Sequence, residues 1–205
     1  MPKDKTASRI KINAAMKAEF LEKGYSGASI RSIGERAGMT SAALYKHYSS
    51  KEEMFCAAVE PLITALHERM EQHTRRKYLL TEIGSDNDAL FGETFTDIVR
   101  EVILPNRTEF LLLMNCSQGT RYENFLHDYA NENMQAVADA IGFMKSRGYP
   151  AKELEKEELH MLLSAYLTAV FEPIIHGLSD MKVEKYLARV NDFFMPGWKN
   201  ILGAS

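Results

Sequence analysis

Residues 29–51, SIRSIGERAGMTSAALYKHYSSK, contain the signals for two short helices joined by a tight turn. Ser29 is placed to cap the first helix, and apolar side chains at positions 30, 33 and 37 give that helix one buried face. Gly38 can end it, because glycine tolerates the left-handed conformation common at helix ends. Thr40 is a second cap, and residues 41–48 suffice for about two more turns. This pattern predicts a helix-turn-helix, whose second helix enters the DNA major groove.

A longer set of motifs surrounds this stretch. They are Phe20-x-x-x-Gly24-Tyr25, Ser29-Ile30-x-x-Ile33, Ala37-Gly38-Met39-Thr40, Leu44-Tyr45-x-His47-Tyr48 and Lys51-Glu52-Glu53. In this order and spacing, the run from Ile12 to Val59 resembles the DNA-binding domain of the tetracycline-repressor (TetR) family of transcriptional regulators. Three residues depart from the family pattern: Gly34 replaces a usual alanine, Tyr48 a usual phenylalanine, and Glu19 stands at a normally apolar position.

The recognition helix supplies the candidate DNA contacts. Phosphate oxygens are the expected partners of Tyr45, His47 and Lys51, and the helix starts at Ser29 and Lys51 add backbone N–H groups. Base edges are the expected partners of the small polar residues at the front of the helix and of Lys46. The full predicted set is Ser29, Arg31, Thr40, Ser41, Ala42, Tyr45, Lys46, His47 and Lys51.

Charge is distributed unevenly along the chain. The 205 residues carry a net charge of −3, but residues 1–51 hold ten lysines and arginines against four acidic residues, whereas the remainder has a net charge of −9. A basic N-terminal segment followed by an acidic body predicts that the former meets a polyanion, here double-stranded DNA.

The rest of the chain predicts further helices and no strands. Helical periodicity and caps place them at about residues 9–23, 51–78, 88–104, 110–114, 120–147, 152–176 and 179–202. No strand-like alternation or Asn-Gly hairpin turn is present, so the expected fold is all-α. We expect residues 1–50 to form the DNA-binding domain and residues 51–205 a helical effector-binding and dimerisation domain.

The helix that begins at Lys51 links these two parts. Ser50-x-x-Glu53 is a capping box at its start. Pro61 lies inside it and cannot donate to the carbonyl of Ala57, so a kink or break is expected there.

The family resemblance implies a pocket for a small effector, and a homodimer built from the last two helices. Eleven methionines and nineteen phenylalanines and tyrosines could line an adaptable apolar cavity, although most such residues form ordinary core. The candidate polar contacts to an effector are Asn115, Gln118, Tyr122, His127, Tyr166 and His176.

Catalysis is the competing class of function. Glu157-x-x-His160 has the spacing of a helical di-iron ligand pair, but a second such pair is missing from the sequence. No zinc-protease motif or glycine-rich phosphate loop occurs, so we expect neither an enzyme nor a metal or other cofactor. Two cysteines and a polar N-terminus without a signal peptide fit a cytoplasmic protein.

The prediction is therefore an effector-responsive transcriptional regulator, a repressor that binds a pseudo-palindromic operator as a homodimer and is released by a small, partly apolar ligand. An activator role stays open, and the alternatives are a helical metal-binding enzyme or a non-DNA interaction protein.

Overall fold

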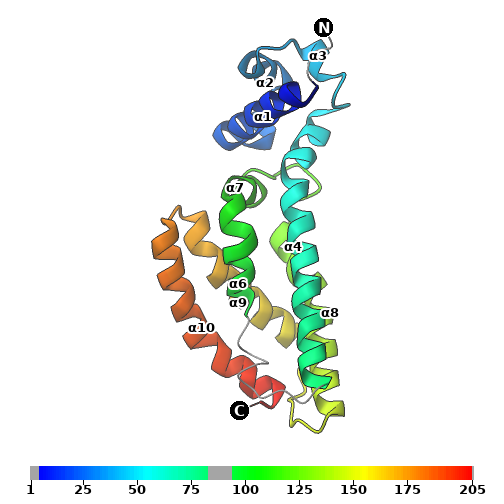
Figure 1. Cartoon of the computed structure of the whole chain (residues 1–205), viewed down its shortest axis with the longest axis vertical. Helices are drawn as coiled ribbons and strands as arrows, with labels where there is room; N and C mark the ends of the chain where they lie inside the picture. The colour runs from blue at the N-terminus through cyan, green and yellow to red at the C-terminus, as the bar shows by residue number, and fades with distance from the viewer. Residues whose placement is uncertain (1–4, 83–93, 205) are drawn as a thin grey trace. The chain divides into compact units, whose positions relative to one another are not determined.

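The structure is a computed structural model that describes residues 5–82 and 94–204. Within these ranges all regular elements are helical (Figure 1), which confirms the predicted all-α class. The elements are α1 (Lys5–Gly27), α2 (Ile30–Ala37), α3 (Ser41–Leu44), α4 (Lys51–Glu82), α6 (Phe95–Ile98), the π-helical η1 (Val99–Ile103), the 3₁₀-helical η2 (Leu104–Asn106), α7 (Arg107–Asn115), α8 (Phe125–Ser146), α9 (Lys156–Ile175) and α10 (Asp180–Leu202).

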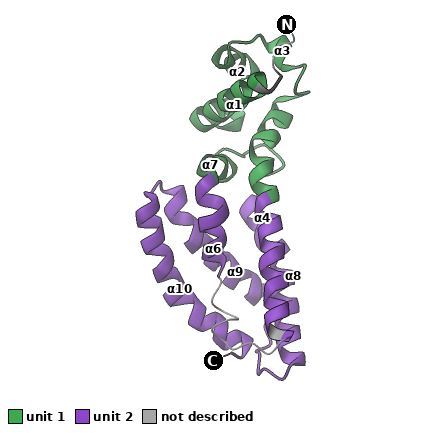
Figure 2. Ribbon diagram, viewed as in Figure 1, with its two compact units in different colours: residues 1–64, 106–124 green, residues 65–105, 125–205 purple. Residues whose placement is uncertain are grey.

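Backbone contacts divide the chain into two compact units (Figure 2). Unit 1 takes its described residues from 1–64 and 106–124, and unit 2 from 65–105 and 125–205. Unit 1 therefore includes the first half of α4 and all of α7 in addition to α1–α3. The predicted division at residue 50 separates the DNA-binding part from the effector-binding and dimerisation part, whereas these two units are defined by backbone contacts. The functional division stays a prediction.

An aromatic cluster forms the core of unit 1. The apolar face of α1 repeats at Ile12, Met16 and Phe20, each at most 1% exposed. The Phe20 ring meets Phe55 of α4 edge-on, with ring centroids 5.2 Å apart, and Tyr25 packs against both rings. These contacts hold the start of α4 against α1.

The segment that contains α7 is attached to α1 by polar contacts. The Tyr25 N–H donates to the carbonyl of Cys116 at 3.0 Å, and the Ser26 hydroxyl donates to the carbonyl of Gln118. Lys17 forms an ion pair with Glu109 of α7. Residues distant in sequence thus complete unit 1.

Phe95 of α6 lies at the centre of the core of unit 2. Its ring contacts those of Tyr129, Tyr166 and Phe171, with centroids 5.9 to 6.2 Å apart. These three residues come from α8 and α9, so the aromatic contacts tie three helices together.

Several predicted helix boundaries differ from the structure. α1 extends from Lys5 to Gly27 rather than over residues 9–23, and α9 begins at Lys156 rather than at residue 152. The predicted helix over residues 88–104 begins outside the described residues, and its described part is divided among α6, η1 and η2. α8 begins at Phe125 rather than at residue 120, because the Glu123 carboxylate accepts from the Gly119 N–H and the Thr120 hydroxyl from the Tyr122 N–H, which makes a turn.

Pro61 does not break its helix. α4 runs uninterrupted from Lys51 to Glu82. Both Pro61 and Ala57 lie on the exposed side of α4, so water can solvate the Ala57 carbonyl that lacks a donor.

Candidate nucleic-acid interface and ligand cavity

The turn between α2 and α3 is fixed by the caps that the sequence predicts. The Ser29 hydroxyl accepts from the Ser32 N–H at 3.1 Å, and the Thr40 hydroxyl accepts from the Ala43 N–H at 3.2 Å. Gly38 adopts the left-handed conformation with φ of 66°. Gly34 lets the turn approach α2 closely, because a Cβ there would lie 2.8 Å from the carbonyl oxygen of Met39. The backbone therefore holds α3 in one defined position on α2.

The predicted base- and phosphate-contacting side chains lie on the surface of this segment. Tyr45 is 55% exposed, and Lys46 and His47 are also exposed. The α-helix itself ends at Leu44, whose fully buried side chain anchors it, and residues 45–47 continue as a turn rather than as the helix to residue 48 that the sequence predicts. In α2, Arg31 forms an exposed ion pair with Glu35.

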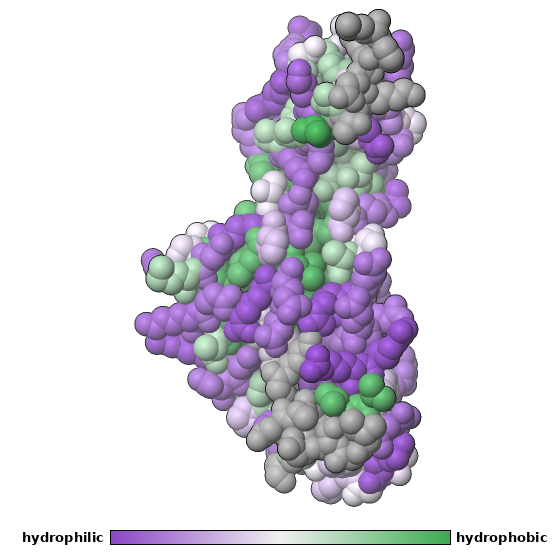
Figure 3. Space-filling view, viewed as in Figure 1, coloured by the Kyte–Doolittle hydropathy of each residue, from purple (hydrophilic) through white to green (hydrophobic). Residues whose placement is uncertain are grey.

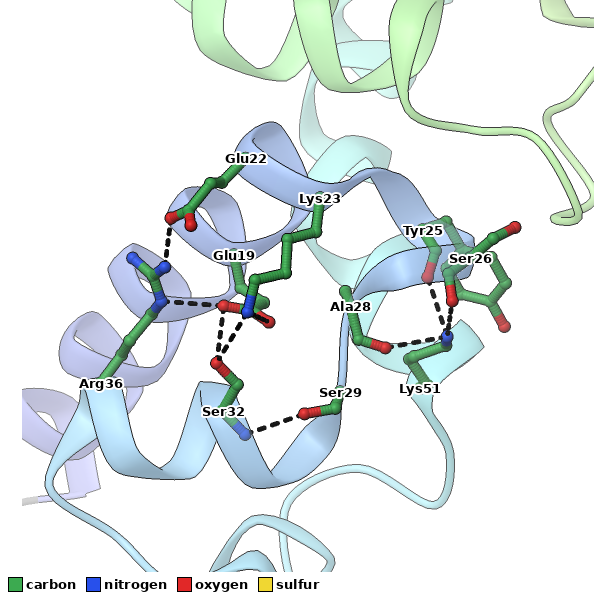
Figure 4. A network of polar contacts seen from close by, with 10 residues as sticks. All are labelled: Glu19, Glu22, Lys23, Tyr25, Ser26, Ala28, Ser29, Ser32, Arg36 and Lys51. Atoms are coloured by element: carbon green, nitrogen blue, oxygen red, sulfur yellow. Dashed lines mark hydrogen bonds and ion pairs between the residues drawn. The ribbon is translucent and has the colours of Figure 1, made fainter.

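Lys51 has a different environment from the other candidates. Its Nζ donates to the carbonyl oxygens of Tyr25 at 2.8 Å, Ala28 at 3.0 Å and Ser26 at 3.4 Å (Figure 4). The same Nζ lies 4.5 Å from the centroid of the Tyr25 ring. Lys51 thus satisfies carbonyl groups at the end of α1, a stabilising role that the sequence did not predict. Its phosphate contact stays a prediction.

Replacing Lys51 by alanine is expected to destabilise unit 1 by about 2 kcal/mol, the usual size for hydrogen bonds from a charged donor. Urea denaturation followed by circular dichroism measures this. Lys46→Ala is the matched control and should change stability by less than about 0.5 kcal/mol. Lys51 is a phosphate contact alone if Lys51→Ala leaves stability unchanged and only makes the slope of log affinity for DNA against log salt concentration shallower by about one unit.

A buried carboxylate joins α1 to α2. The side chain of Glu19 is fully buried and accepts from Lys23 at 3.0 Å, Ser32 at 2.8 Å and Arg36 at 2.8 Å (Figure 4). Burial opposes ionisation of Glu19, but the hydrogen bonds from these three residues outweigh it and lower the pKa of the carboxyl group. The departure from an apolar residue at this position is therefore compensated by partners on both helices.

Unit 2 contains a partly open, mostly apolar cavity of about 230 Å³. Its walls come from the second half of α4, from α6, and from α8, α9 and α10. The lining residues are Met70, His73, Thr74, Lys77, Tyr78, Thr94, Phe95, Asn133, Ala136, Val137, Ala140, Phe143, Met144, Leu163, Tyr166, Leu167, Met195, Trp198 and Leu202. Five of these residues are also found in the wall of a neighbouring, more open hollow of about 510 Å³: Met70, Thr74, Tyr78, Asn133 and Ala136.

Of the six effector candidates, Tyr166 alone lines this cavity. Asn115, Gln118 and Tyr122 belong to unit 1, where Tyr122 donates a hydrogen bond to Glu60 at 3.1 Å. In unit 2, His127 is exposed and bonded to Asn131, and His176 is exposed and paired with Glu172. The structure does not bring the six together, and only Tyr166 remains a candidate contact for a ligand in this cavity.

Sequence reasoning missed most of the cavity wall. Several aromatic residues look like core residues in the sequence, but in this fold they both pack in the core and line the cavity. They are Tyr78, Phe95, Phe143 and Trp198. No periodicity separates a wall residue from a core residue, because both lie on the inner face of a helix.

Within residues 5–82 and 94–204, no three histidine, cysteine or acidic side chains gather as metal ligands, and Glu157-x-x-His160 acquires no partner set. By length and composition α9 could cross a bilayer, but core helices pass the same test, and α9 buries eight residues in the protein, Leu159 to Ile174.

Comparison with known proteins agrees with this geometry. Residues 12–58 match the model for bacterial regulatory proteins of the tetR family. The chain is 26% identical over 179 residues to the HTH-type transcriptional regulator YdgC of Bacillus subtilis, covering 81% of this chain and 85% of that one. It is 31% identical over 75 residues to the transcriptional activator FasR of Mycolicibacterium smegmatis, covering 37% of this chain and 33% of FasR.

A solved structure extends the likeness in fold to nearly the whole chain. NalD of Pseudomonas aeruginosa, the secondary repressor of the MexAB-OprM multidrug efflux pump, aligns with a TM-score of 0.60 at 19% identity, covering 96% of each chain. The N-terminal motif match, the regulator relatives and the shared fold lead to one conclusion: this chain is a member of the TetR family of transcriptional regulators.

Proposed function

We propose that the protein is an effector-responsive repressor that binds a pseudo-palindromic DNA operator as a homodimer in the cytoplasm. The observation that carries this proposal is the α2–α3 segment. Capped at both helices, it presents Tyr45, Lys46 and His47 to solvent on a basic N-terminal segment. The repressor role is favoured by the likeness of the whole fold to NalD, whereas the activator FasR is matched over a third of its length.

The homodimer rests on apolar side chains that α9 and α10 leave exposed. Met161 and Leu162 of α9 are 62% and 40% exposed, and Met181 and Phe193 of α10 are 83% and 79% exposed. Hydrophilic side chains predominate on the face drawn in Figure 3, and apolar ones lie on it in separate patches. Exposed apolar side chains on two neighbouring helices are suited to packing against a second copy of the same helices, which would form a four-helix interface.

Effector control rests on α4. Met70, His73, Thr74, Lys77 and Tyr78 of this helix line the cavity in unit 2, and its first half belongs to unit 1. A ligand that favours one placement of the second half would shift the population of that state and so alter DNA binding. By linkage, DNA must then weaken effector binding by the same factor. Because α4 is continuous through Pro61, we propose that the helix moves as one piece rather than bending at a break at that residue.

Selection of genomic DNA fragments by the purified protein tests the function. We expect a small number of fragments that share one inverted repeat, and the genes beside them would indicate the effector. Retention of fragments in proportion to length alone, with no shared sequence, would contradict a regulator.

The exposed lysine of the recognition segment is expected to read bases. Lys46→Ala should cost about 1–3 kcal/mol of operator affinity, concentrated at particular base pairs. Fluorescence anisotropy with operator variants and random DNA measures this difference. An equal loss on operator and on random DNA would assign Lys46 to the phosphate backbone instead.

A further inference from the structure

The charges around the cavity restrict what it can bind. Among the lining residues given above, none is an aspartate or glutamate, and the only cationic or titratable-base side chains are His73 and Lys77. Both already interact with other groups of the protein. Among the described lining residues, a buried cation would therefore find no carboxylate, and a buried anion would find only positive groups that already interact with the protein, so burying an ion there would be costly.

The wall of the neighbouring hollow does not supply an unpaired charge for a bound ion either. Its charged side chains are engaged with each other: His67 contacts Glu132 at 3.2 Å, and Arg75 contacts Glu71 at 2.8 Å. Each of the four charged side chains in the wall of the hollow is therefore paired with one of opposite or complementary charge. An uncharged ligand suits these surroundings best.

The hydroxyl of Tyr166 in the cavity wall lacks a hydrogen-bond partner within the described residues. Tyr166 is 6% exposed, and its hydroxyl makes no hydrogen bond there. The rings of Phe194, Phe95 and Trp198, with centroids 5.2, 6.2 and 6.3 Å away, hold its ring in place. Burial raises the pKa of Tyr166, with a further contribution from the charge of Asp97, so the hydroxyl stays a protonated donor at neutral pH. Buried donors without partners are uncommon and costly.

We propose that the cavity binds a compact, uncharged, largely apolar ring compound with one hydrogen-bond acceptor, which accepts from the Tyr166 hydroxyl. At about 230 Å³ the cavity is smaller than the roughly 300–1,000 Å³ common for drug-sized ligands, so its volume favours a compact molecule. Aromatic side chains in its wall favour a flat ring, which they can meet by stacking or edge-on. The inference rests on the proposed effector function and specifies the chemistry of the effector.

Two probes of equal shape separate the acceptor from the ring. 1-Indanone carries a carbonyl on a two-ring apolar body, and indane is the same body without it. Titration calorimetry of the full-length protein, without DNA, should give about tenfold tighter binding of 1-indanone than of indane, as expected for satisfying a buried donor. Quenching of Trp198, which lines the cavity and is the single tryptophan of the chain, reports that the probe has entered.

Tyr166→Phe removes the hydroxyl and keeps the ring. We expect this variant to bind the two probes with equal affinity and to bind indane as the wild type does. Tyr149→Phe, at a half-buried tyrosine outside the cavity wall, is the matched control and should keep the tenfold preference.

A preference for 1-indanone that persists in Tyr166→Phe would overturn the proposal, as would failure of the wild type to bind either probe. Because the titration contains no DNA, it judges the ligand class independently of regulation. A probe that binds with the expected preference but leaves operator affinity unchanged would instead fault the effector function.

Discussion

Glu19→Ala is expected to lower the free energy of unfolding of unit 1 by about 3 kcal/mol. The fully buried carboxylate accepts hydrogen bonds from Lys23 on its own helix and from Ser32 and Arg36 on α2. Alanine removes all three and leaves a void between α1 and α2. Amide hydrogen exchange of peptides from these two helices measures the loss directly, because it reports local opening.

Glu22→Ala is the matched control, since Glu22 lies on the same helix and pairs with the same Arg36 but is 56% exposed. Exposed ion pairs contribute little, so this variant should change stability by less than about 1 kcal/mol. If both substitutions lower the stability of unit 1 equally, then burial of Glu19 does not increase its contribution to that stability.

The contribution of Glu19 also has a defined pH dependence. Its pKa is lower in the folded protein than the ordinary value of 4.5, so its stabilisation is complete above that value and is lost as the pH falls through the folded pKa. The difference in stability between wild type and Glu19→Ala should therefore be full at pH 7 and shrink in acid below about pH 4.5. A difference that stays constant down to pH 3 would contradict the charged, hydrogen-bonded state of this residue.

Phe193→Glu is expected to separate the proposed homodimer and to weaken operator binding more than about 100-fold. In a two-fold interface the substitution occurs twice, and each copy loses an aromatic anchor and places a carboxylate in an apolar contact. Phe193 is 79% exposed in the single chain, so the fold itself should remain intact. Sedimentation velocity and operator binding by anisotropy measure the two effects together.

Leu79→Glu controls for the general cost of a charged substitution. Leu79 is a 56% exposed apolar residue on α4, outside the proposed interface. The Leu79→Glu variant should have the same sedimentation coefficient and the same operator affinity as the wild type. If Phe193→Glu sediments as the wild type does, the α9–α10 face is not where the copies meet.

The local features of the α2–α3 segment could be predicted from sequence because each depends on few residues. The caps at Ser29 and Thr40 and the left-handed Gly38 are short-range effects of side-chain hydroxyls and glycine. The same is true of the apolar face of α1, which follows from spacing alone.

Features that depend on distant residues could not be predicted. The ammonium of Lys51 binds carbonyl groups more than twenty residues away, and nothing in its local sequence separates that role from a phosphate contact. Likewise, the attachment of the α7 segment to α1 arises from tertiary contacts such as that of Tyr25 with Cys116. The tyrosines illustrate the same limit, because Tyr122 and Tyr166 look alike in sequence and only the fold places one of them in the cavity wall.

Hydroxyl-radical footprinting of a selected operator fragment tests most directly whether two recognition segments bind DNA together. The account predicts two protected regions related by two-fold symmetry, with centres about one helical turn of roughly 34–36 Å, or a multiple of it, apart. Both regions should disappear together in Phe193→Glu. A single protected region that persists in this variant, or no protection at all, would contradict the account.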